Sequence, residues 1–547
     1  MFGPGGEGPF FRREKPMIQE EKMTKLQNEI KRRRTFAIIS HPDAGKTTLT
    51  EKLLLLGGAI RTAGAVKSRK AEKFATSDWM ELEKKRGISV TSSVMQFEYE
   101  HYRINILDTP GHQDFSEDTY RTLMAVDSAV MIIDAAKGVE PQTIKLFKVC
   151  SERGIPIFTF INKLDRQGRD PLELFEEIED VLGIETFPIN YPIGMGNTFR
   201  GVYDRREHKI EWYNEKRERQ VQQLGEVDEL GNILKGTVDD YTLGQLQENL
   251  TLLDEAGNAF DFAAIEHGKQ TPVFFGSAIS SFGVPTFLEH FLKLAPPPQP
   301  RRSSTGVIRP DDPRFSGFIF KIQANMNPAH RDRIAFLRIV SGAFHKGMIV
   351  YQDRTGKPLK LAQPQQFFAD SRELIEEAYP GDIVGLYDTG IYQIGDAVCA
   401  EKETFNFGAL PQFAPEHFAK VRAKNAMKQK HFLKGISQLA QEGAIQVYRT
   451  PYEETILGVV GTLQFDVFVY RMQAEYGVEL DIERMPHQIA KWIADRDDAE
   501  KLRRNSDYLI VTDYKERPVI IFENDFALRW FKQKHPQIEL RDSSHNM

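Results

Sequence analysis

The stretch that decides the fold is Phe36-Ala37-Ile38-Ile39-Ser40-His41-Pro42-Asp43-Ala44-Gly45-Lys46-Thr47-Thr48. An apolar strand here runs into a loop and then into a helix, the arrangement typical of a phosphate-binding loop. Backbone N–H groups of the loop hold anionic oxygens, Lys46 adds a charge at the β- and γ-phosphates, and the Thr47 hydroxyl can bind Mg²⁺. Ser40 stands where the strict pattern has Gly, but Gly45-Lys46-Thr47 is intact. The stretch therefore predicts that residues 40–48 bind a nucleotide polyphosphate.

A second strand ends in Asp108-Thr109-Pro110-Gly111-His112. An Asp at the end of such a strand can hold Mg²⁺ through water. Gly111 can offer its backbone N–H to a γ-phosphate, because it has no Cβ in the way. We therefore expect these five residues at the phosphate end of the site, with Thr47 and Asp108 as metal ligands.

Two further strands end in residues that can recognise a base. One is followed by Asn162-Lys163-Leu164-Asp165, and the other ends in Phe274-Phe275-Gly276-Ser277-Ala278. The Asp165 carboxylate can accept from N1–H and the exocyclic amine of guanine, a pair of donors that adenine lacks. Asn162 can pair with the N7/O6 edge, the stem of Lys163 can pack on the ring, and the backbone N–H of Ala278 can reach O6. In series with the phosphate loop, these motifs predict binding of GTP or GDP with Mg²⁺.

The motifs resemble those of the translational GTPases. Residues 41–48, Arg86-Gly87-Ile88-Ser89 and residues 108–112 resemble the phosphate loop, first switch and second switch of elongation factor G and its relatives. The resemblance implies that His112 is catalytic and positions the attacking water, with Pro42 and Ile88 as an apolar gate and Asp43 close to the phosphates. Ser89 stands where most of the family has a Thr that reaches Mg²⁺. The resemblance therefore implies Ser89 as a third metal ligand.

Length and composition indicate an ordinary soluble protein. At 547 residues the chain has room for about three to four domains. Its net charge is −6, 41% of its residues are hydrophobic, and its mean hydropathy is −0.43. No apolar stretch is long enough to span a bilayer, and the N-terminus lacks the apolar core of a signal peptide. Cys150 and Cys399 suggest neither a disulfide framework nor a zinc site. We expect a cytoplasmic monomer that does not contact membranes.

The first half of the chain predicts an α/β domain. Residues 1–30 form a Gly/Pro-rich and then charged extension, expected to be disordered or helical. In residues 31–295, apolar strands alternate with helical stretches at Thr47–Leu56, Pro141–Arg153 and Pro171–Leu182. This alternation predicts a P-loop GTPase domain with a mostly parallel sheet covered on both faces. The distance between Asp165 and Gly276 exceeds one crossover and predicts an insertion subdomain at about residues 166–270.

The second half predicts two further domains. Ala295-Pro296-Pro297-Pro298-Gln299-Pro300 is a stiff linker, because prolines hold the chain extended. Short strands separated by glycine turns predict a β-barrel domain at residues 306–402. Residues 405–547 mix helices and strands and predict an α+β domain.

The third predicted domain indicates which relatives of elongation factor G the chain resembles. Residues 461–466, Gly-Thr-Leu-Gln-Phe-Asp, stand where elongation factor G has Gly-x-Gly-Glu-Leu-His, and Glu475-Tyr476-Gly477-Val478 follow. In this the chain resembles the bacterial class II release factors, and the resemblance extends from Arg32 onward. It implies a ribosome-stimulated GTPase of translation termination. The implied partners are the ribosome and the codon-reading class I release factors, whose dissociation and recycling after peptide release it would promote.

Two alternatives remain open. One is a sensor that binds guanine nucleotides or an alarmone with extra phosphates. The other is a different ribosomal GTPase related to elongation factor G. We expect the absence of two further domains to count against this second alternative. The sequence also contains no Gly-Gly-Gln, the tripeptide used by factors that cleave peptidyl-tRNA.

A basic stretch at residues 420–430 predicts a helix with Lys420, Lys424 and Lys428 on one face. Such a face is either simply solvated or a contact for ribosomal RNA. The sequence leaves both interpretations open.

Overall fold

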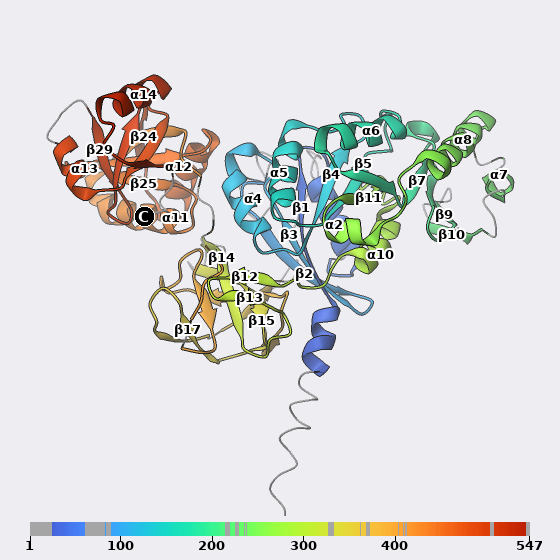
Figure 1. Cartoon of the computed structure of the whole chain (residues 1–547), viewed down its shortest axis with the longest axis horizontal. Coiled ribbons are helices and arrows are strands. Elements are labelled where there is room, and N and C mark those ends of the chain that lie inside the picture. Colours follow the sequence, from blue (N-terminus) through green and yellow to red (C-terminus); the bar gives the residue numbers. More distant parts are fainter. Residues whose placement is uncertain are drawn as a thin grey trace, which may run out of the picture.

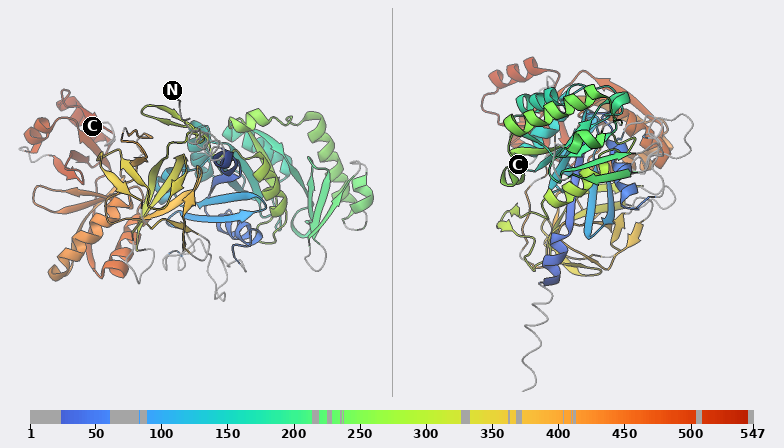
Figure 2. Two further views of the ribbon diagram at one scale, coloured as in Figure 1. Left: turned by 90° about the horizontal axis from the view of Figure 1, so that it is seen from below. Right: turned by 90° about the vertical axis from the view of Figure 1, so that its right-hand side faces the viewer.

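The computed structural model describes residues 24–60, 83, 89–213, 219–224, 229–234, 236, 238–325, 333–361, 363–367, 372–402, 404–408, 410, 413–503 and 508–542. Figure 1 shows the nucleotide domain in the centre, the second domain below it and the C-terminal domain beside it, with the insertion on the opposite side. Figure 2 shows the same order from below. The first 23 residues lie outside the described part, whereas residues 24–31 are helical and lead into the first strand.

A seven-stranded sheet in the order β2-β3-β1-β4-β5-β11-β6 forms the centre of the nucleotide domain. Its strands are β1 (Arg33–Ser40), β2 (Ser93–Tyr99), β3 (Tyr102–Asp108), β4 (Ser128–Asp134), β5 (Ile157–Asn162), β6 (Glu185–Pro188) and β11 (Gln270–Phe275). β2 runs antiparallel to β3, and the remaining pairs are parallel. The predicted mostly parallel sheet is confirmed.

Helices cover both faces of this sheet. Successive residues of β1 point to opposite faces, and both sets of side chains are buried under helices. Phe36 and Ile38 belong to the core under α2 (Lys46–Leu56) and α10 (Val284–Leu294). Ala37 and Ile39 belong to the core under α5 (Pro141–Glu152) and α6 (Pro171–Leu182). The three predicted helices therefore form where expected, within one residue at each end. α4 (Ser116–Leu123) follows the turn after β3.

The insertion has a sheet of its own. It consists of β7 (Asn190–Ile193), β8 (Gly201–Asp204), β9 (Lys209–Tyr213) and β10 (Arg219–Gln223). Its helices are α7 (Glu229–Leu234), α8 (Asp240–Ala256) and α9 (Phe262–Glu266). Within the range predicted for the insertion, α6 and β6 instead belong to the nucleotide domain, because β6 pairs with β11. The separate sheet thus begins at Asn190.

The second domain is a curled antiparallel sheet, a half-barrel, in the order β18-β17-β23-β14-β15-β22-β19-β20. The strands are β14 (Ser316–Ala324), β15 (Arg333–Ser341), β17 (Ile349–Gln352), β18 (Pro358–Lys360), β19 (Gln365–Phe367), β20 (Arg372–Leu374), β22 (Ile383–Tyr387) and β23 (Ala397–Cys399). Two short pairs accompany it, β12 (Arg301–Ser303) with β13 (Gly306–Ile308) and β16 (Phe344–His345) with β21 (Glu377–Ala378). The short strands expected from the sequence form this sheet, which is curled as a half-barrel where a β-barrel was predicted.

The C-terminal domain is an α+β domain, as predicted. Its sheet runs in the order β27-β24-β26-β25-β29-β30-β28-β31. The strands are β24 (His417–Ala423), β25 (Gln446–Arg449), β26 (Thr455–Val459), β27 (Leu480–Met485), β28 (Ile489–Ile493), β29 (Leu509–Asp513), β30 (Pro518–Phe522) and β31 (Leu540–Arg541). The helices are α11 (Gln429–Gln441), α12 (Leu463–Tyr476), α13 (Arg496–Arg503) and α14 (Asp525–Lys534).

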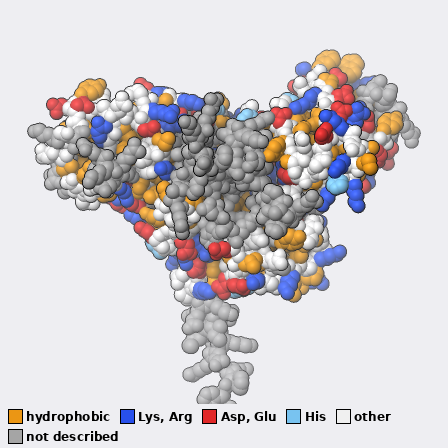
Figure 3. Space-filling view, turned by 180° about the vertical axis from the view of Figure 1, so that it is seen from behind, with side chains coloured by type: hydrophobic (Ala, Val, Ile, Leu, Met, Phe, Trp, Pro, Cys, Tyr) orange, Lys and Arg blue, Asp and Glu red, His pale blue; other side chains and the backbone are white. Residues whose placement is uncertain are grey.

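The predicted basic helical face is wrong. Residues 417–423 form β24, which pairs with β26 on one side and β27 on the other. Lys420 lies 3.1 Å from Glu454 and Lys424 lies 3.9 Å from Glu479, so both are balanced by carboxylates of neighbouring segments. On the face of the molecule in Figure 3, basic and acidic side chains are likewise interspersed. None of the described helices combines the length and apolar composition that crossing a bilayer requires.

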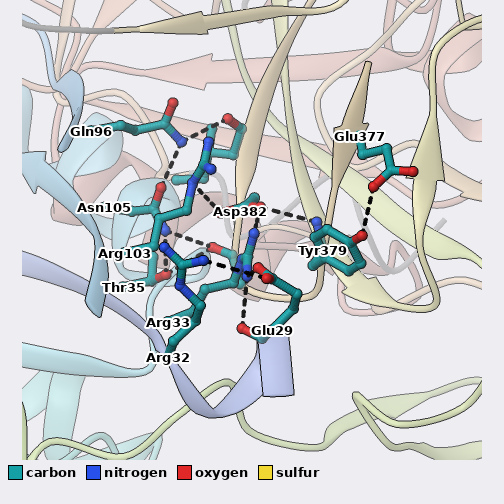
Figure 4. Close-up of polar contacts among 12 residues, drawn as sticks. Glu29, Arg32, Arg33, Thr35, Gln96, Arg103, Asn105, Glu377, Tyr379 and Asp382 are labelled. Atoms are coloured by element: carbon teal, nitrogen blue, oxygen red, sulfur yellow. Dashed lines mark hydrogen bonds and ion pairs between the residues drawn. The ribbon is translucent and has the colours of Figure 1, made fainter. Parts of the chain in front are cut away.

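Polar contacts attach the second domain directly to β1 (Figure 4). Arg33 forms an ion pair of 2.7 Å with Asp382, and both side chains are buried. Burial raises the pKa of Asp382, but the nearby Arg33 and Arg103 outweigh it and hold that pKa below its ordinary value. The Thr35 hydroxyl also donates to the carbonyl of Gly381 at 2.7 Å. The strand that leads into the phosphate loop is therefore fixed to the neighbouring domain.

Candidate guanine nucleotide site

The phosphate loop connects β1 to α2 along a path that needs left-handed backbone at Asp43 (φ 67°) and Gly45 (φ 103°). At Gly45 no side chain could be accommodated, because a Cβ would lie 2.1 Å from Nδ2 of Asn162. Gly45 is also the N-cap of α2 and provides no side-chain cap. The N–H groups at this helix end thus remain suited to anionic oxygens. The predicted residues Ser40, His41, Pro42, Asp43, Ala44, Gly45, Lys46, Thr47 and Thr48 all lie on this path.

Lys46 and Asp108 meet at the centre of the site. Nζ of Lys46 lies 2.6 Å from Oδ1 of Asp108, with the side chains 7% and 2% exposed. The second carboxylate oxygen, Oδ2, is buried and has no hydrogen-bond partner among the described residues. Leaving a buried carboxylate oxygen unpaired is costly, and a divalent cation is a suitable partner for it. Asp108 therefore fits the predicted Mg²⁺ site. Thr47, another predicted ligand, follows Lys46 in the first turn of α2.

Asn162 holds two of the other loops together. Its Nδ2 donates to the carbonyl of Ala44 at 2.9 Å, and its Oδ1 accepts the N–H of Ala278 at 2.9 Å. The N–H of Ala278, predicted to reach O6 of the base, is thus directed at Asn162 in this structure. An amide nitrogen has two N–H groups, so Asn162 keeps a second donor beyond the one used by Ala44. The residue therefore shapes the site in addition to any contact with a base.

Asp165 is held by a hydroxyl and remains reachable from solvent. The Ser277 hydroxyl donates to Oδ1 of Asp165 at 2.6 Å, and the Asp165 side chain is 29% exposed. Leu164 between the two polar positions is fully buried. Oδ2 of Asp165 lies 3.9 Å from Nε of the exposed Arg166, so the carboxylate stays accessible, as its predicted contact with a base requires.

Lys163 connects the phosphate loop to the end of β4. Its Nζ donates to the carbonyl of Asp43 and lies 2.7 Å from Oδ2 of Asp134, the last residue of β4. Burial raises the pKa of Asp134, but hydrogen bonds from Lys163 and from the N–H of Ala136 outweigh burial, so this pKa lies below its ordinary value. Asp134 therefore stays charged and holds the stem of Lys163 between the loops.

The second-switch segment places His112 at the start of a short 3₁₀ turn, η1 (Gln113–Phe115). Thr109 fixes the preceding residues, since its hydroxyl donates to the carbonyl of Ile38 at 2.7 Å. A Cβ on Gly111 would lie 3.4 Å from Cα of Pro42, so this segment approaches the phosphate loop closely. The His112 side chain is 35% exposed, and its Nδ1 accepts the N–H of Asp114 at 3.2 Å. The segment thus brings Asp108, Thr109, Pro110, Gly111 and His112 to the phosphate loop.

Of the four first-switch residues, the structure describes Ser89. Arg86, Gly87 and Ile88 lie outside the described residues, so of the predicted gate only Pro42 is described. Ser89 is half-buried and opens the segment that continues into β2. Its predicted role as a metal ligand stays a prediction.

Three family models match the chain in succession. Residues 31–297 match the elongation factor Tu GTP binding domain, residues 314–401 match elongation factor G domain 2, and residues 407–532 match the C-terminal domain of class II release factor RF3. Peptide chain release factor 3 of Listeria innocua is 60% identical over 519 residues, which cover 94% of this chain and 98% of that protein. The chain belongs to the release factor 3 family.

Other similar proteins agree with this assignment. Peptide chain release factor 3 of Symbiobacterium thermophilum is 56% identical over 523 residues, covering 95% of this chain and 99% of that protein. A solved structure from Thermus thermophilus superposes with a TM-score of 0.67 at 23% identity, over 84% of this chain and 69% of that chain, which supports the fold alone. As a member of the release factor 3 family, the chain is a translational GTPase and hence an enzyme.

One further group of potential metal ligands lies where the insertion of this release factor 3 family member meets α10. Asp204, Glu207 and His290 come together there, with Asp204 2.6 Å from Nε2 of His290. Lys209 already supplies a positive charge at 2.6 Å from Glu207. Hydrogen bonds from Lys209 and Lys293 lower the pKa of Glu207 to about 2. The group is an ion-pair network and does not need a metal.

Sequence reasoning missed two residues of this site. Asp134 ends β4 at the same sheet edge as the predicted residues, and this position was the signal that could have identified it. Asp114 lies two residues after His112 but gave no signal of its own. Its carboxylate contacts the C-terminal domain, where Leu463 donates its N–H to Oδ2 at 2.8 Å.

Proposed function

We propose that this chain hydrolyses GTP on the terminating ribosome and thereby promotes dissociation of codon-reading class I release factors after peptide release. The observation that carries the proposal is that one chain combines the four nucleotide loops with the C-terminal domain of class II release factors. Its partners would be the ribosome and the class I factors, and it would act as a monomer in the cytoplasm, where bacterial ribosomes work.

The residues divide the work of binding the nucleotide. Lys46 and the N–H groups of the phosphate loop would hold the β- and γ-phosphates. Thr47, Ser89 and Asp108 would hold Mg²⁺, which neutralises charge on the phosphates. The base would be held by Asp165, Asn162 and Lys163, with Ser277 and Ala278 fixing the first two of these.

In the hydrolytic step, His112 orients a water for attack on the γ-phosphorus. The bond between that phosphorus and the β–γ bridging oxygen breaks, which yields GDP and inorganic phosphate. His112 contributes by placing the water in line, and Lys46 by stabilising the charge that develops on the leaving oxygen.

The recycling role predicts a specific result in a peptide-release assay with a class I factor in limiting amount. Adding this protein and GTP raises the number of release events per class I factor, because a nucleotide-dependent change of shape favours a ribosome that holds the factor poorly. On its own the protein releases no peptide from a stop-codon complex, since its sequence contains no Gly-Gly-Gln.

A pair of variants at Thr47 controls this assay. Thr47→Ala removes a proposed Mg²⁺ ligand and should abolish recycling, whereas Thr47→Ser keeps the hydroxyl and should retain it. Equal release with and without the wild-type protein contradicts the proposal and favours the sensor alternative.

A further inference from the structure

The turn that follows His112 is attached to the C-terminal domain. Oδ2 of Asp114 accepts the backbone N–H of Leu463, the first residue of α12, at 2.8 Å. The N-cap of that helix, Thr462, makes no side-chain cap of its own. Figure 1 shows α12 on the side of the C-terminal domain that faces α4 of the nucleotide domain. A residue of the nucleotide domain therefore supplies the carboxylate that a helix N-terminus favours.

Gly461 allows this contact. A Cβ at Gly461 would lie 1.9 Å from Cγ of Asp114 and 2.3 and 2.4 Å from its two oxygens, and these are the three nearest atoms. Gly461 is not among the described glycines with positive φ, so its backbone could carry a side chain without strain. The glycine at this position thus serves the close approach of Asp114.

The other side of Asp114 faces His112. Nδ1 of the imidazole accepts the backbone N–H of Asp114 at 3.2 Å, and this is the hydrogen bond between the two residues; Oδ1 of Asp114 lies 3.4 Å from the same nitrogen. An imidazole whose Nδ1 accepts an N–H carries its proton on Nε2. Asp114 therefore directs Nδ1 toward itself and leaves Nε2 for the water.

Apolar packing holds the same turn against the same helix. Phe115 is buried in a cluster with Val90, from the segment after the first switch, and Val467 of α12. Leu463 and Tyr470 pack against this cluster. The turn that carries His112 is thus held by α12 through both a hydrogen bond and an apolar contact.

We propose that Asp114 is a positioning residue for His112 and that α12 of the C-terminal domain sets its position. Because Oδ2 of Asp114 is bound to α12, a shift of α12 moves the turn whose backbone N–H holds Nδ1 of His112. The inference rests on the proposed role of His112 in hydrolysis. Through Asp114, the arrangement of the domains controls the rate of GTP hydrolysis.

The first test uses Asp114→Ala and Gly461→Ala in the full-length protein with ribosomes. Each should lower the ribosome-stimulated kcat by about 10-fold or more, because each breaks the contact between the turn and α12, and a turn that shifts no longer keeps the imidazole aligned with the water. The affinity for GTP and the thermal unfolding midpoint should remain those of the wild type. Thr462→Ala is the matched control: its exposed side chain makes no cap bond, and it should hydrolyse GTP normally.

A double-mutant cycle separates positioning from a merely structural role. In a His112→Ala background, neither Asp114→Ala nor Gly461→Ala should lower the residual rate further. Asp114→Ala combined with Gly461→Ala should match Asp114→Ala alone, since the obstacle to the new Cβ is gone.

Three results would overturn the inference. They are normal kcat in Asp114→Ala and Gly461→Ala, equal losses with and without His112, or a double variant much slower than Asp114→Ala. In each of these cases a slow His112→Ala protein would still support the proposed function. A His112→Ala protein that hydrolyses GTP at the wild-type rate would overturn both.

Discussion

Replacing His112 with Ala lowers ribosome-stimulated GTP hydrolysis by a factor of at least ~100 and leaves the affinity for GTP nearly unchanged. The side chain lies at the end of the second-switch segment, where it contacts the turn of Asp114, whereas the phosphates are assigned to Lys46 and the loop. Loss of the imidazole therefore removes an interaction with the attacking water and not with the bound nucleotide. Single-turnover hydrolysis with saturating ribosomes, paired with nucleotide titration, measures the two effects separately.

Two further variants serve as comparisons for His112→Ala. Lys46→Ala should weaken nucleotide binding itself, because it removes the charge that faces the phosphates. His101→Ala is the matched control, since His101 is exposed in the turn before β3, at the opposite end of that strand from Asp108. Normal turnover in the His112→Ala protein would exclude a catalytic role for this histidine.

The convergence of the predicted site residues could be predicted because each of their motifs lies at or just after the end of an apolar strand. In a parallel sheet the carboxyl ends of the strands meet at one edge, so Gly45, Asp108, Asn162 and Ser277 come together without any knowledge of loop geometry. Asp134 also lies at the end of an apolar strand. Its contact with Lys163 was not predicted because no familiar motif surrounds Asp134.

Contacts between domains were not predictable. Asp114 and Leu463 lie 349 positions apart, and no local sequence pattern indicates that Asp114 caps the helix that begins at Leu463. Gly461 belongs to a motif that distinguished the family, but the reason for glycine there is visible only where Asp114 occupies the space of its Cβ. Lys420 shows the opposite error: a spacing of four between lysines suggested a helix, whereas pairing of β24 with β26 and β27 overrides that local pattern.

Replacing Asp165 with Asn changes which base the site prefers. The carboxylate is oriented by the Ser277 hydroxyl, which donates to Oδ1 at 2.6 Å. An Asn can keep that hydrogen bond through its carbonyl and then presents an NH₂ group where guanine offers two donors of its own. We expect a loss of about 2–4 kcal/mol of GTP binding, because donors are left facing donors.

The same change should restore binding of a different nucleotide. Xanthosine triphosphate carries a carbonyl where guanine has its amine, so it can accept from the new NH₂ group and should bind Asp165→Asn more tightly than GTP does. Ser277→Ala is the control, since it removes the hydroxyl that orients Asp165 and should weaken GTP binding without creating a preference for xanthosine triphosphate. Competition between the two triphosphates on each variant measures the preference directly. If Asp165→Asn still prefers GTP, Asp165 does not read the base, and recognition must lie with Asn162 and the loop of Ala278 that it holds in place.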